Sequence, residues 1–259
     1  MSAHNLFRLE GRVAFVSGAA GHLGQAMSRA LSEAGAHVIL NGRDADRLKA
    51  FAAELKSTEC AAFDVMDTQA VRAFFSKRRR LDILVNNAIS MTPKPFAALE
   101  GEDFARTYAS GVTAAFELAR AALPAMKDAA KATGDASIVN IASMYGVVSP
   151  DARIYNKREQ ASPFHYGPAK AALLQLTRHL AAEFAPDRIR VNAIVPGPFP
   201  RPAIQKDDPD FAARLASRTM LGRLGNAEEM AGPLLFLASP ASSYVTGTGL
   251  AVDGGWTAW

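Results

Sequence analysis

The sequence predicts an α/β protein built on a doubly wound, parallel, seven-stranded sheet with helices on both faces. Short apolar runs rich in β-branched residues alternate with segments of helical spacing along all 259 residues, which is the pattern of parallel strands joined by helical crossovers. Apolar residues make up 49% and charged residues 21% of the chain, so a sizeable core can form and disorder is excluded. No composition shift and no repeat divides the sequence. We therefore expect residues 1–259 to form a single domain.

Seven apolar runs are expected to be strands, each typical of a strand buried on both faces. They are Val13–Ser17, His37–Asn41, Cys60–Phe63, Ile83–Asn86, Ser137–Ile141, Arg190–Val195 and Leu250–Val252. Stripes of apolar residues at helical spacing lie between them, as at Leu23, Met27, Ala30, Leu31 and Ala34, and at Ala169, Leu173, Leu176, Leu180 and Phe184. These stripes predict helices packed on the sheet, in a Rossmann-type fold.

Charge and cysteine content narrow the class of protein. A net charge of +4 is too small and too dispersed to indicate nucleic-acid binding, although it suits an anionic ligand. The basic run 77–80 is interpreted as the end of a surface helix. Cys60 is the only cysteine, so an intramolecular disulfide is excluded. We expect a buried thiol, a reducing compartment and a cytoplasmic location.

The chain is not expected to enter a membrane. Residues 1–11 are polar and charged with no apolar core, so they do not predict a secretory signal. Residues 230–252 carry no charged side chain and are long enough to span a bilayer, but they contain prolines, serines and glycines. That composition predicts a helix, a turn and a buried strand instead.

Two segments, 144–165 and 196–224, interrupt the alternation of strands and helices. The second contains four prolines at alternate positions, from Pro196 to Pro202. Loops of this length in a compact domain are usually functional. Both begin at the carboxyl end of an expected strand, which is where such sheets bind ligands. We expect these segments to be substrate lids.

A glycine-rich turn follows the first expected strand and reads Ser17-Gly18-Ala19-Ala20-Gly21-His22-Leu23-Gly24. Glycines let the backbone turn tightly and approach a pyrophosphate, whose charge is met by the N–H groups and the positive dipole of the next helix. Taken alone, such a turn can equally be a turn and nothing more.

The end of the second expected strand bears on the choice of nucleotide. A fold that prefers NAD places an acidic residue here to bind the ribose hydroxyls, whereas this chain has Asn41-Gly42-Arg43. A guanidinium binds a 2′-phosphate bidentately, so NADP(H) is favoured, with NAD(H) as the alternative. A solvated surface arginine is the other interpretation of Arg43. Asp64, after the third strand, is expected either to accept from the adenine amino group or to cap a helix.

Three residues at the other end of the site can do proton chemistry. Tyr166 and Lys170 are one helical turn apart and share a face. An ammonium near a phenol favours the phenolate and lowers the pKa of Tyr166, which would let it donate or accept a proton near neutral pH. Ser143, after the fifth strand, offers a hydroxyl to hold a carbonyl or alcohol oxygen. Each residue also has a plain structural interpretation, as a buried tyrosine, a surface lysine and a capping serine.

The ordered motifs together resemble the short-chain dehydrogenase/reductase family, in its single-domain branch. They are the turn at 18–24, Asn86-Asn87-Ala88, Ser143, the pair Tyr166 and Lys170, Pro196-Gly197, and Val252-Asp253-Gly254-Gly255. The resemblance implies that Tyr166 is the general acid/base, that Lys170 lowers its pKa and binds the nicotinamide ribose, and that Ser143 orients the reacting oxygen.

The cofactor residues that follow from the turn, the arginine and the resemblance are distributed along the chain. They are Gly18, Gly21, His22, Leu23, Gly24, Asn41, Arg43, Asp64, Val65, Asn87, Ala88, Ile89, Tyr166, Lys170, Pro196, Gly197 and Phe199. The reaction needs no metal, and the five histidines lack the spacing of metal ligands.

The sequence departs from the family pattern at three places. His22 replaces a usual glycine, which leaves a G-x-x-G-x-x-G spacing similar to the extended branch of the family, but the chain ends soon after its last strand and that branch is rejected. Gly111 stands where an asparagine usually supports a water relay to the lysine, so either water and Ser110 replace it or turnover is impaired. Ser143 and Tyr166 are 23 positions apart, which is longer than usual in the family.

Tyr155 lies nearer to the usual distance from Ser143, but Glu159 and not a lysine follows it by four residues. The extra segment 150–158 resembles an insertion in family members of sugar or nonulosonate metabolism. Its Arg153, Lys157 and Arg158 are expected either to meet a substrate carboxylate or phosphate or to be solvated loop charges.

These observations predict an NADP(H)-dependent oxidoreductase that moves a hydride between the nicotinamide and a ketone or secondary alcohol. Similarity to gluconate 5-dehydrogenase-like members favours a small hydroxylated or acidic substrate. The alternatives are a 3-oxoacyl thioester reductase and a catalytically weak NADP(H)-binding sensor or scaffold. The family resemblance implies a homotetramer.

Overall fold

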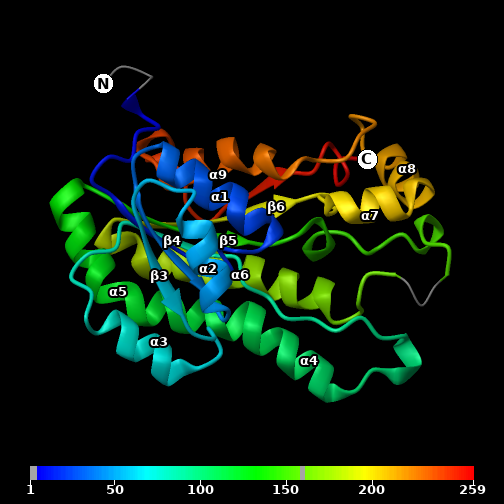
Figure 1. Ribbon diagram of the computed structural model, residues 1–259, viewed down its shortest axis with the longest axis horizontal. Coiled ribbons are helices and arrows are strands. Elements are labelled where there is room, and N and C mark those ends of the chain that lie inside the picture. Colours follow the sequence, from blue (N-terminus) through cyan, green and yellow to red (C-terminus); the bar gives the residue numbers. More distant parts are fainter. Residues whose placement is uncertain (1–4, 158–160) are drawn as a thin grey trace.

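The computed structural model describes residues 5–157 and 161–259, which form a parallel, seven-stranded sheet with helices on both faces (Figure 1). The strands are β1 (Val13–Val16), β2 (His37–Gly42), β3 (Thr58–Ala62), β4 (Ile83–Asn86), β5 (Ala136–Ile141), β6 (Ile189–Pro196) and β7 (Gly249–Val252). Their order is β3-β2-β1-β4-β5-β6-β7, and every neighbouring pair is parallel. The predicted fold class is confirmed.

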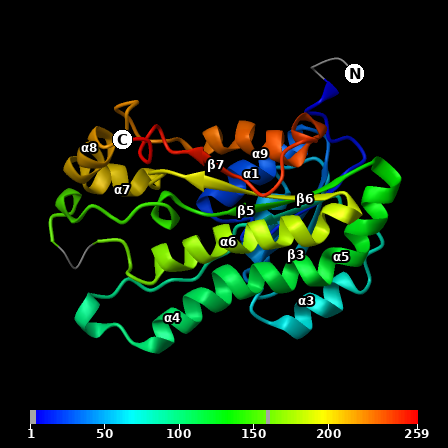
Figure 2. The ribbon, with the colours of Figure 1, turned by 180° about the vertical axis from the view of Figure 1, so that it is seen from behind.

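Helices cover both faces of the sheet (Figures 1 and 2). One face carries α1 (His22–Glu33), α2 (Ala45–Ala52) and α9 (Ala231–Ala238). The other carries α3 (Thr68–Phe75), α4 (Gly101–Tyr108), α5 (Ala114–Thr133) and α6 (Tyr166–Phe184). Short 3₁₀ turns are formed by Phe96–Ala98, Met144–Gly146, Ala152–Ile154, Ala185–Asp187, Ala227–Met230 and Pro240–Ser242.

Each face of the sheet has its own apolar core. Phe15 of β1 is fully buried and packs against the rings of Phe63, Phe74 and Phe75, with centroids 5.2–6.2 Å apart. On the other face, Met27 of α1 and its neighbours pack on the central strands. Burial of these side chains on both faces is what the near-continuous apolar runs predicted, and it makes the sheet a rigid base for the loops at its carboxyl edge.

The two outer strands correct the expectation that every strand is buried on both faces. β3 and β7 lie at the edges of the sheet, and side chains along both remain partly exposed. Cys60 of β3 is exposed, so the expected buried thiol was wrong. An edge strand has a neighbour on one side alone, and its short apolar run does not reveal that it is the outermost strand.

The two expected lid segments differ in structure. Residues 196–224 are not a continuous loop, because they contain α7 (Pro202–Asp207) and α8 (Pro209–Ser217), each beginning at a proline that fits the first helical turn. Both helices lie at the end of the molecule remote from the N-terminus (Figure 1). The described part of 144–165 contains two 3₁₀ turns before α6. No helix in the described residues is long and apolar enough to cross a membrane.

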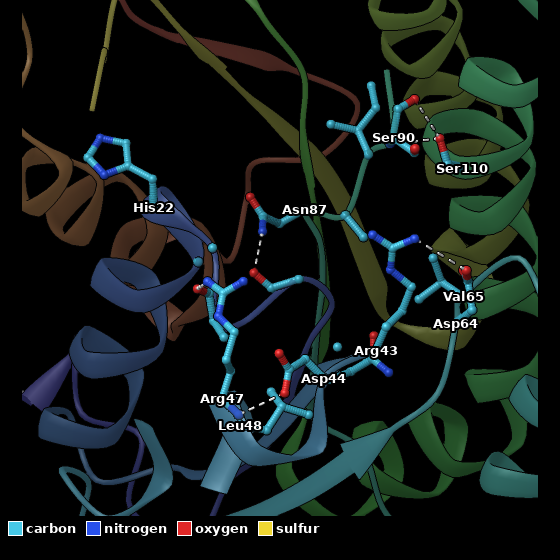
Figure 3. A pocket seen from close by; sticks show the side chains of 18 of the residues that line it. His22, Arg43, Asp44, Arg47, Leu48, Asp64, Val65, Asn87, Ser90 and Ser110 are labelled. Atoms are coloured by element: carbon cyan, nitrogen blue, oxygen red, sulfur yellow. Dashed lines mark hydrogen bonds and ion pairs between the residues drawn. The ribbon is translucent and has the colours of Figure 1, made fainter. Parts of the chain in front are cut away.

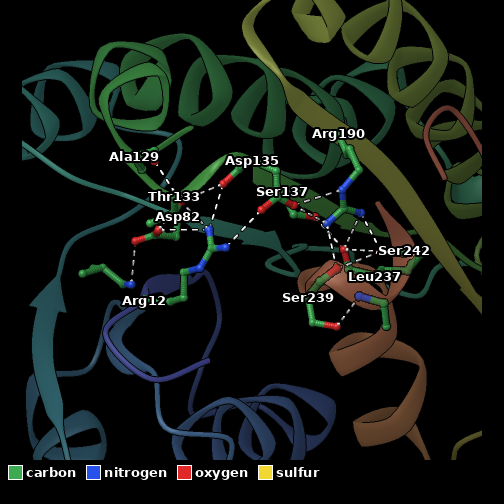
Figure 4. A network of polar contacts seen from close by, with 12 residues as sticks. Arg12, Asp82, Ala129, Thr133, Asp135, Ser137, Arg190, Leu237, Ser239 and Ser242 are labelled. Carbon is green, nitrogen blue, oxygen red and sulfur yellow. Dashed lines mark hydrogen bonds and ion pairs between the residues drawn. The ribbon is translucent and has the colours of Figure 1, made fainter. Parts of the chain in front are cut away.

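A polar network ties the amino ends of four strands together, at the edge opposite the loops discussed below (Figure 4). Asp82, just before β4, is fully buried and accepts from the Val13 backbone N–H at 2.9 Å and from Arg80 at 2.8 and 3.0 Å. Arg12 reaches Asp82 and Asp135. Arg190, at the start of β6, binds Asp135 and the Leu237 carbonyl.

Replacing Asp82 with asparagine should lower the free energy of unfolding by about 3 kcal/mol, because Arg12 and Arg80 would lose the carboxylate that balances them and one amide N–H would face a donor. Urea unfolding is the measurement. Asp46→Asn is the matched control, since the side chain of Asp46 is 97% exposed and its loss should change stability by less than about 0.5 kcal/mol. Equal effects at the two positions would show that the network does not stabilise the fold.

Candidate active site

A cavity of about 370 Å³ lies at the carboxyl ends of β1 to β4 (Figure 3). The strand order reverses at β1, which has β2 on one side and β4 on the other, and such a switch point is where open α/β sheets bind their ligands. Loops after four strands line the cavity, at 18–24, 41–48, 63–66 and 87–90. The volume is within the range of small-molecule sites.

The glycine-rich turn forms one wall of the cavity, and its glycines are required by its shape. Gly18 has φ +65°, and a Cβ there would lie 3.0 Å from the Asn87 amide nitrogen. A Cβ on Gly24 would lie 2.2 Å from the Gly18 carbonyl oxygen. The turn leads into α1, whose first N–H groups have no partner within the helix. The bare backbone and the helix start together fit a pyrophosphate.

Ser17 and Asn87 hold this turn against the loop after β4. The Ser17 hydroxyl accepts from the backbone N–H groups of Asn87 and Ala88, at 2.9 and 3.0 Å. The Asn87 amide donates to the carbonyls of Ser17 and Gly18, at 3.0 and 3.2 Å. Asn87 therefore shapes the cavity wall through these hydrogen bonds.

The end of β2 forms the opposite wall. Asn41 is buried, and its amide donates to the carbonyls of Ala61 and Phe63 at 2.9 and 3.1 Å. Its Oδ1 atom is buried with no partner among the described residues. An unpaired buried acceptor on a cavity wall indicates a donor from a ligand, and the ribose and adenine of a dinucleotide carry such donors. The residues present therefore fit the expected cofactor.

Arg43 and Asp64 face each other across the mouth of the cavity (Figure 3), with 3.9 Å between the guanidinium and the carboxylate. The Arg43 side chain is 72% exposed, so it is free to turn toward a ligand. Asp64 accepts from the Met66 N–H, while Asp67 caps α3. The alternative interpretation of Asp64 as a helix cap is therefore wrong.

Two arginines that the sequence reasoning missed also line the cavity. The Arg47 guanidinium donates to the Ala20 carbonyl of the glycine-rich turn at 3.1 Å. Arg201 reaches the same cavity from the start of α7. Arg47 lies in the first turn of α2, four residues after Arg43, and this closeness in the sequence offered a signal. Arg201 is brought in by tertiary folding alone, so the sequence carried no comparable signal.

Ser143, Tyr166 and Lys170 meet where β5 and α6 approach each other. The turn 143–146 lies directly on the first turns of α6, because two glycines permit contact between backbones. A Cβ on Gly146 would lie 2.8 Å from the Lys170 carbonyl carbon, and a Cβ on Gly167 would lie 2.8 Å from the Tyr145 carbonyl oxygen. Ser143 and Lys170 are buried. The three predicted residues are thus brought together.

The ionisation of the pair differs from the sequence-based expectation. Burial raises the pKa of Tyr166, and the nearby Ser143 hydroxyl offsets this in part. Burial lowers the pKa of Lys170 to about 8. The Lys170 ammonium donates to the Ile141 carbonyl at 2.6 Å and lies 5.6 Å from the centre of the Tyr166 ring. Desolvation is the largest influence on both groups, so the Tyr166 phenol keeps its proton at neutral pH.

Gly111 lies in a turn of π-helix, Ala109–Thr113, between α4 and α5. A Cβ at this position would lie 3.1 Å from Ile89 Cδ1, so an asparagine would require Ile89 to move. The Ser110 hydroxyl accepts from the Ser90 N–H at 2.9 Å and lies within hydrogen-bond distance of three backbone carbonyls. Ser110 therefore holds the loop after β4 instead of facing Lys170.

Some predicted site residues lie outside the cavity. Pro196 ends β6 and pairs with Val252, and Gly197 packs on the Asp253 backbone. The Phe199 ring packs against Gly225 and lines a separate cavity of about 360 Å³. None of these three residues lines the cavity at the glycine-rich turn.

The cations of the extra segment are also placed differently from the expectation. The guanidinium of Arg153 is bound to the Asp151 carboxylate at 2.8 and 2.9 Å, which lowers the pKa of Asp151 to about 2. Lys157 is exposed, and Arg158 lies outside the described residues. Arg153 is therefore already paired within the protein.

Comparison with known proteins gives consistent results over nearly the whole chain. A family model described as enoyl-(acyl carrier protein) reductase matches residues 18–257. The chain is 38% identical over 268 residues to a galactitol 2-dehydrogenase (L-tagatose-forming) from Cereibacter sphaeroides, with 100% of both chains covered. It is 34% identical to a rhamnolipids biosynthesis 3-oxoacyl-(acyl-carrier-protein) reductase from Pseudomonas aeruginosa, covering 97% of this chain and 98% of that protein.

A solved structure is similar in fold as well. The gluconate 5-dehydrogenase from Burkholderia cenocepacia, in complex with NADP and tartrate, superposes with a TM-score of 0.86 at 32% identity, covering 99% of both chains.

Proposed function

Because the chain belongs to the short-chain dehydrogenase/reductase family, we propose that it is an NADP(H)-dependent oxidoreductase that interconverts a ketone and a secondary alcohol on a small hydroxylated substrate. The observation that carries the proposal is the meeting of Ser143, Tyr166 and Lys170 in a fold that also holds a cavity walled by the glycine-rich turn. The relatives named as a galactitol dehydrogenase and a gluconate dehydrogenase support a small polyhydroxylated substrate.

The bound nicotinamide would supply the hydride, and the chain supplies the proton and the orientation. Tyr166 is protonated at neutral pH because burial raises its pKa, so its hydroxyl can donate a proton to a carbonyl oxygen as the alcohol forms. The Ser143 hydroxyl lies beside Tyr166 and can hold the same oxygen. The Lys170 ammonium supports the phenolate that remains after proton transfer. These groups act as general acid, orienting donor and electrostatic support.

Gly18, Gly21 and Gly24, with the start of α1, would hold the pyrophosphate. Val65, Ala88, Ile89, His22 and Leu23 also line the cavity and would contact the remainder of the dinucleotide. We propose the same for Pro196, Gly197 and Phe199, which lie at the start of the second expected lid. The two segments 144–165 and 196–224 would then cover the substrate.

Arg43 should decide the preference for NADP(H) over NAD(H). Replacing Arg43 with alanine should weaken NADPH binding about thirtyfold, because charge-assisted hydrogen bonds to the 2′-phosphate are lost. NADH binding should change less than twofold, because NADH lacks that phosphate. Fluorescence titration of the nicotinamide measures both constants. Arg178→Ala, at an exposed position on α6, is the matched control. If the variant lost affinity for both nucleotides equally, Arg43 would not read the 2′-phosphate.

A second candidate function is reduction of a 3-oxoacyl thioester, which the Pseudomonas aeruginosa relative supports by its name. Activity assays with NADPH distinguish the two candidates directly. Turnover of an acetoacetyl thioester in preference to L-tagatose would favour the acyl reductase.

We also propose one domain, a cytoplasmic location and a homotetramer. A partly exposed edge strand at β7 and exposed apolar side chains near the C-terminus, such as Tyr244 and Trp259, are consistent with association between copies. Sedimentation analysis tests the oligomeric state.

A further inference from the structure

We propose that the hydroxyls of Tyr145 and Tyr155 form a second substrate-binding subsite, which recognises a neutral hydroxyl group of the substrate beyond the reacting carbon. The inference rests on the proposed oxidoreductase function, because it places the subsite beside Tyr166. The two phenol oxygens lie 3.0 Å apart and are hydrogen-bonded. They come from different parts of the expected lid, the 3₁₀ turn Met144–Gly146 and the residue after Ala152–Ile154.

The position of Tyr145 is fixed relative to the proposed proton donor. Tyr145 is two residues after Ser143, and its backbone N–H donates to the Ser143 hydroxyl at 3.2 Å. Its own carbonyl lies against Gly167, the residue after Tyr166. Tyr145 and Tyr166 therefore lie on the two sides of the contact between the turn 143–146 and the start of α6. A substrate held by Tyr166 and Ser143 would therefore extend toward Tyr145.

Both rings are held by neighbours and cannot turn freely. The Tyr145 ring meets Trp256 edge-on, with centroids 6.5 Å apart. The Tyr155 ring packs on Phe211 of α8 at 5.4 Å. Arg214 of α8 also donates to the Ile154 carbonyl at 2.8 Å. The second lid segment thus positions a residue of the first, and the hydroxyl pair is pre-organised for binding.

The hydrogen-bonding capacity of the pair matches a hydroxyl group. One O–H is used between the two phenols, while the second O–H and several lone pairs have no other partner within residues 5–157 and 161–259. One free donor and free acceptors are what a substrate hydroxyl complements. Burial keeps the pKa of Tyr145 above its ordinary value, so the phenol stays neutral. An apolar acyl chain would leave these polar groups unpaired, at a cost in affinity.

Two arginines near the phenol pair share one carboxylate. Arg153 and Arg218 are both directed to Asp151, at 2.8 and 3.6 Å. One carboxylate balances one of these two positive charges, so the preference for a hydroxyl group rests on the phenol pair and not on the local charge. We infer that the substrate class is a neutral polyol, or the corresponding hydroxyketone.

The test compares a polyol with a monofunctional alcohol in three forms of the protein: wild type, Tyr145→Phe and Tyr155→Phe. With galactitol and NADP+, kcat/KM should fall about tenfold in each variant, because one substrate hydrogen bond is lost. With cyclohexanol, kcat/KM should change less than twofold. Tyr244→Phe is the matched control, since Tyr244 is fully exposed. Equal losses on both alcohols, or no loss on galactitol, would overturn the subsite.

Equilibrium binding separates this inference from the proposed function. Galactitol is titrated into each protein saturated with NADP+, and thermal shift reports its Kd, which should rise about tenfold in the two variants. If wild type bound galactitol in this tyrosine-dependent way but never turned it over, the proposed function would fail while the subsite stood. If wild type turned galactitol over and neither tyrosine substitution changed its binding or turnover, the function would stand and the subsite would be wrong. Absence of both binding and turnover would overturn both.

Discussion

Replacing Tyr166 with phenylalanine should lower kcat for carbonyl reduction by about 10³-fold, because the substitution removes the one hydroxyl placed to donate the proton. The ring remains, so packing at the start of α6 is retained. Ser143 is beside it but is a far weaker acid than a phenol and cannot replace it. Steady-state assays of NADPH oxidation with L-tagatose measure the loss, and the Kd for NADPH should stay within twofold of wild type.

The same variant separates an enzyme from a sensor. Gly111, where the family usually has asparagine, motivates the alternative of a protein that binds NADP(H) with little turnover. A sensor would show tight NADPH binding in wild type, no measurable reduction of any ketone, and no effect of Tyr166→Phe on its role. If wild type reduced ketones and the variant reduced them equally well, Tyr166 would not be the proton donor.

Replacing Lys170 with methionine should lower kcat about 10²-fold, because the phenolate of Tyr166 would form without a buried positive charge to support it. The assay is again NADPH oxidation at neutral pH. Lys127→Met is the matched control, since Lys127 is on α5 in a partly exposed pair with Asp187. Activity within a factor of three of wild type would show that Lys170 has a structural role alone.

Lys170 should also leave a signature in stability as a function of pH. Its pKa is about 8 in the folded protein and 10.5 when unfolded, so between these values the unfolded state binds the proton and the folded state does not. Stability therefore rises with pH through this window. Between pH 8 and pH 10 the unfolding free energy of wild type should gain on the order of 2 kcal/mol relative to Lys170→Met. If the unfolding free energies of wild type and Lys170→Met changed with pH in the same way, Lys170 would not be a buried lysine with a lowered pKa.

The fold was readable from the sequence because local pattern and tertiary structure agree in this chain. Apolar β-branched runs such as 83–86 and 189–196 are buried on both faces, as continuous hydrophobicity predicts. The edge position of β3 was not readable, since the sequence of a strand does not specify how many neighbours it has. Cys60 was therefore expected inside and lies outside.

The site residues also divide into those that local sequence predicts and those that tertiary packing places. The glycine-rich turn and the pair Tyr166 and Lys170 are local motifs. Within each motif, the residues are neighbours in the structure, as their spacing in the sequence implies. The position of Arg201 and the contact between Tyr145 and Tyr155 depend on how loops and helices pack in three dimensions, so spacing alone did not predict them. The direction of the Tyr166 pKa shift depends on whether burial or a nearby positive charge has the larger effect. The identities of the residues do not decide this.

Transfer of deuterium from [4-²H]NADPH to L-tagatose tests the central claim most directly. Both C4 epimers of the labelled cofactor are supplied in separate reactions, and the product is analysed by mass spectrometry. We predict that one epimer gives a polyol carrying one deuterium at the reduced carbon, that the other gives none, and that Tyr166→Phe gives neither at a comparable rate. NADPH bound tightly with no label in any product, from L-tagatose or from the acetoacetyl thioester, would contradict the assignment of this site as one that transfers hydride.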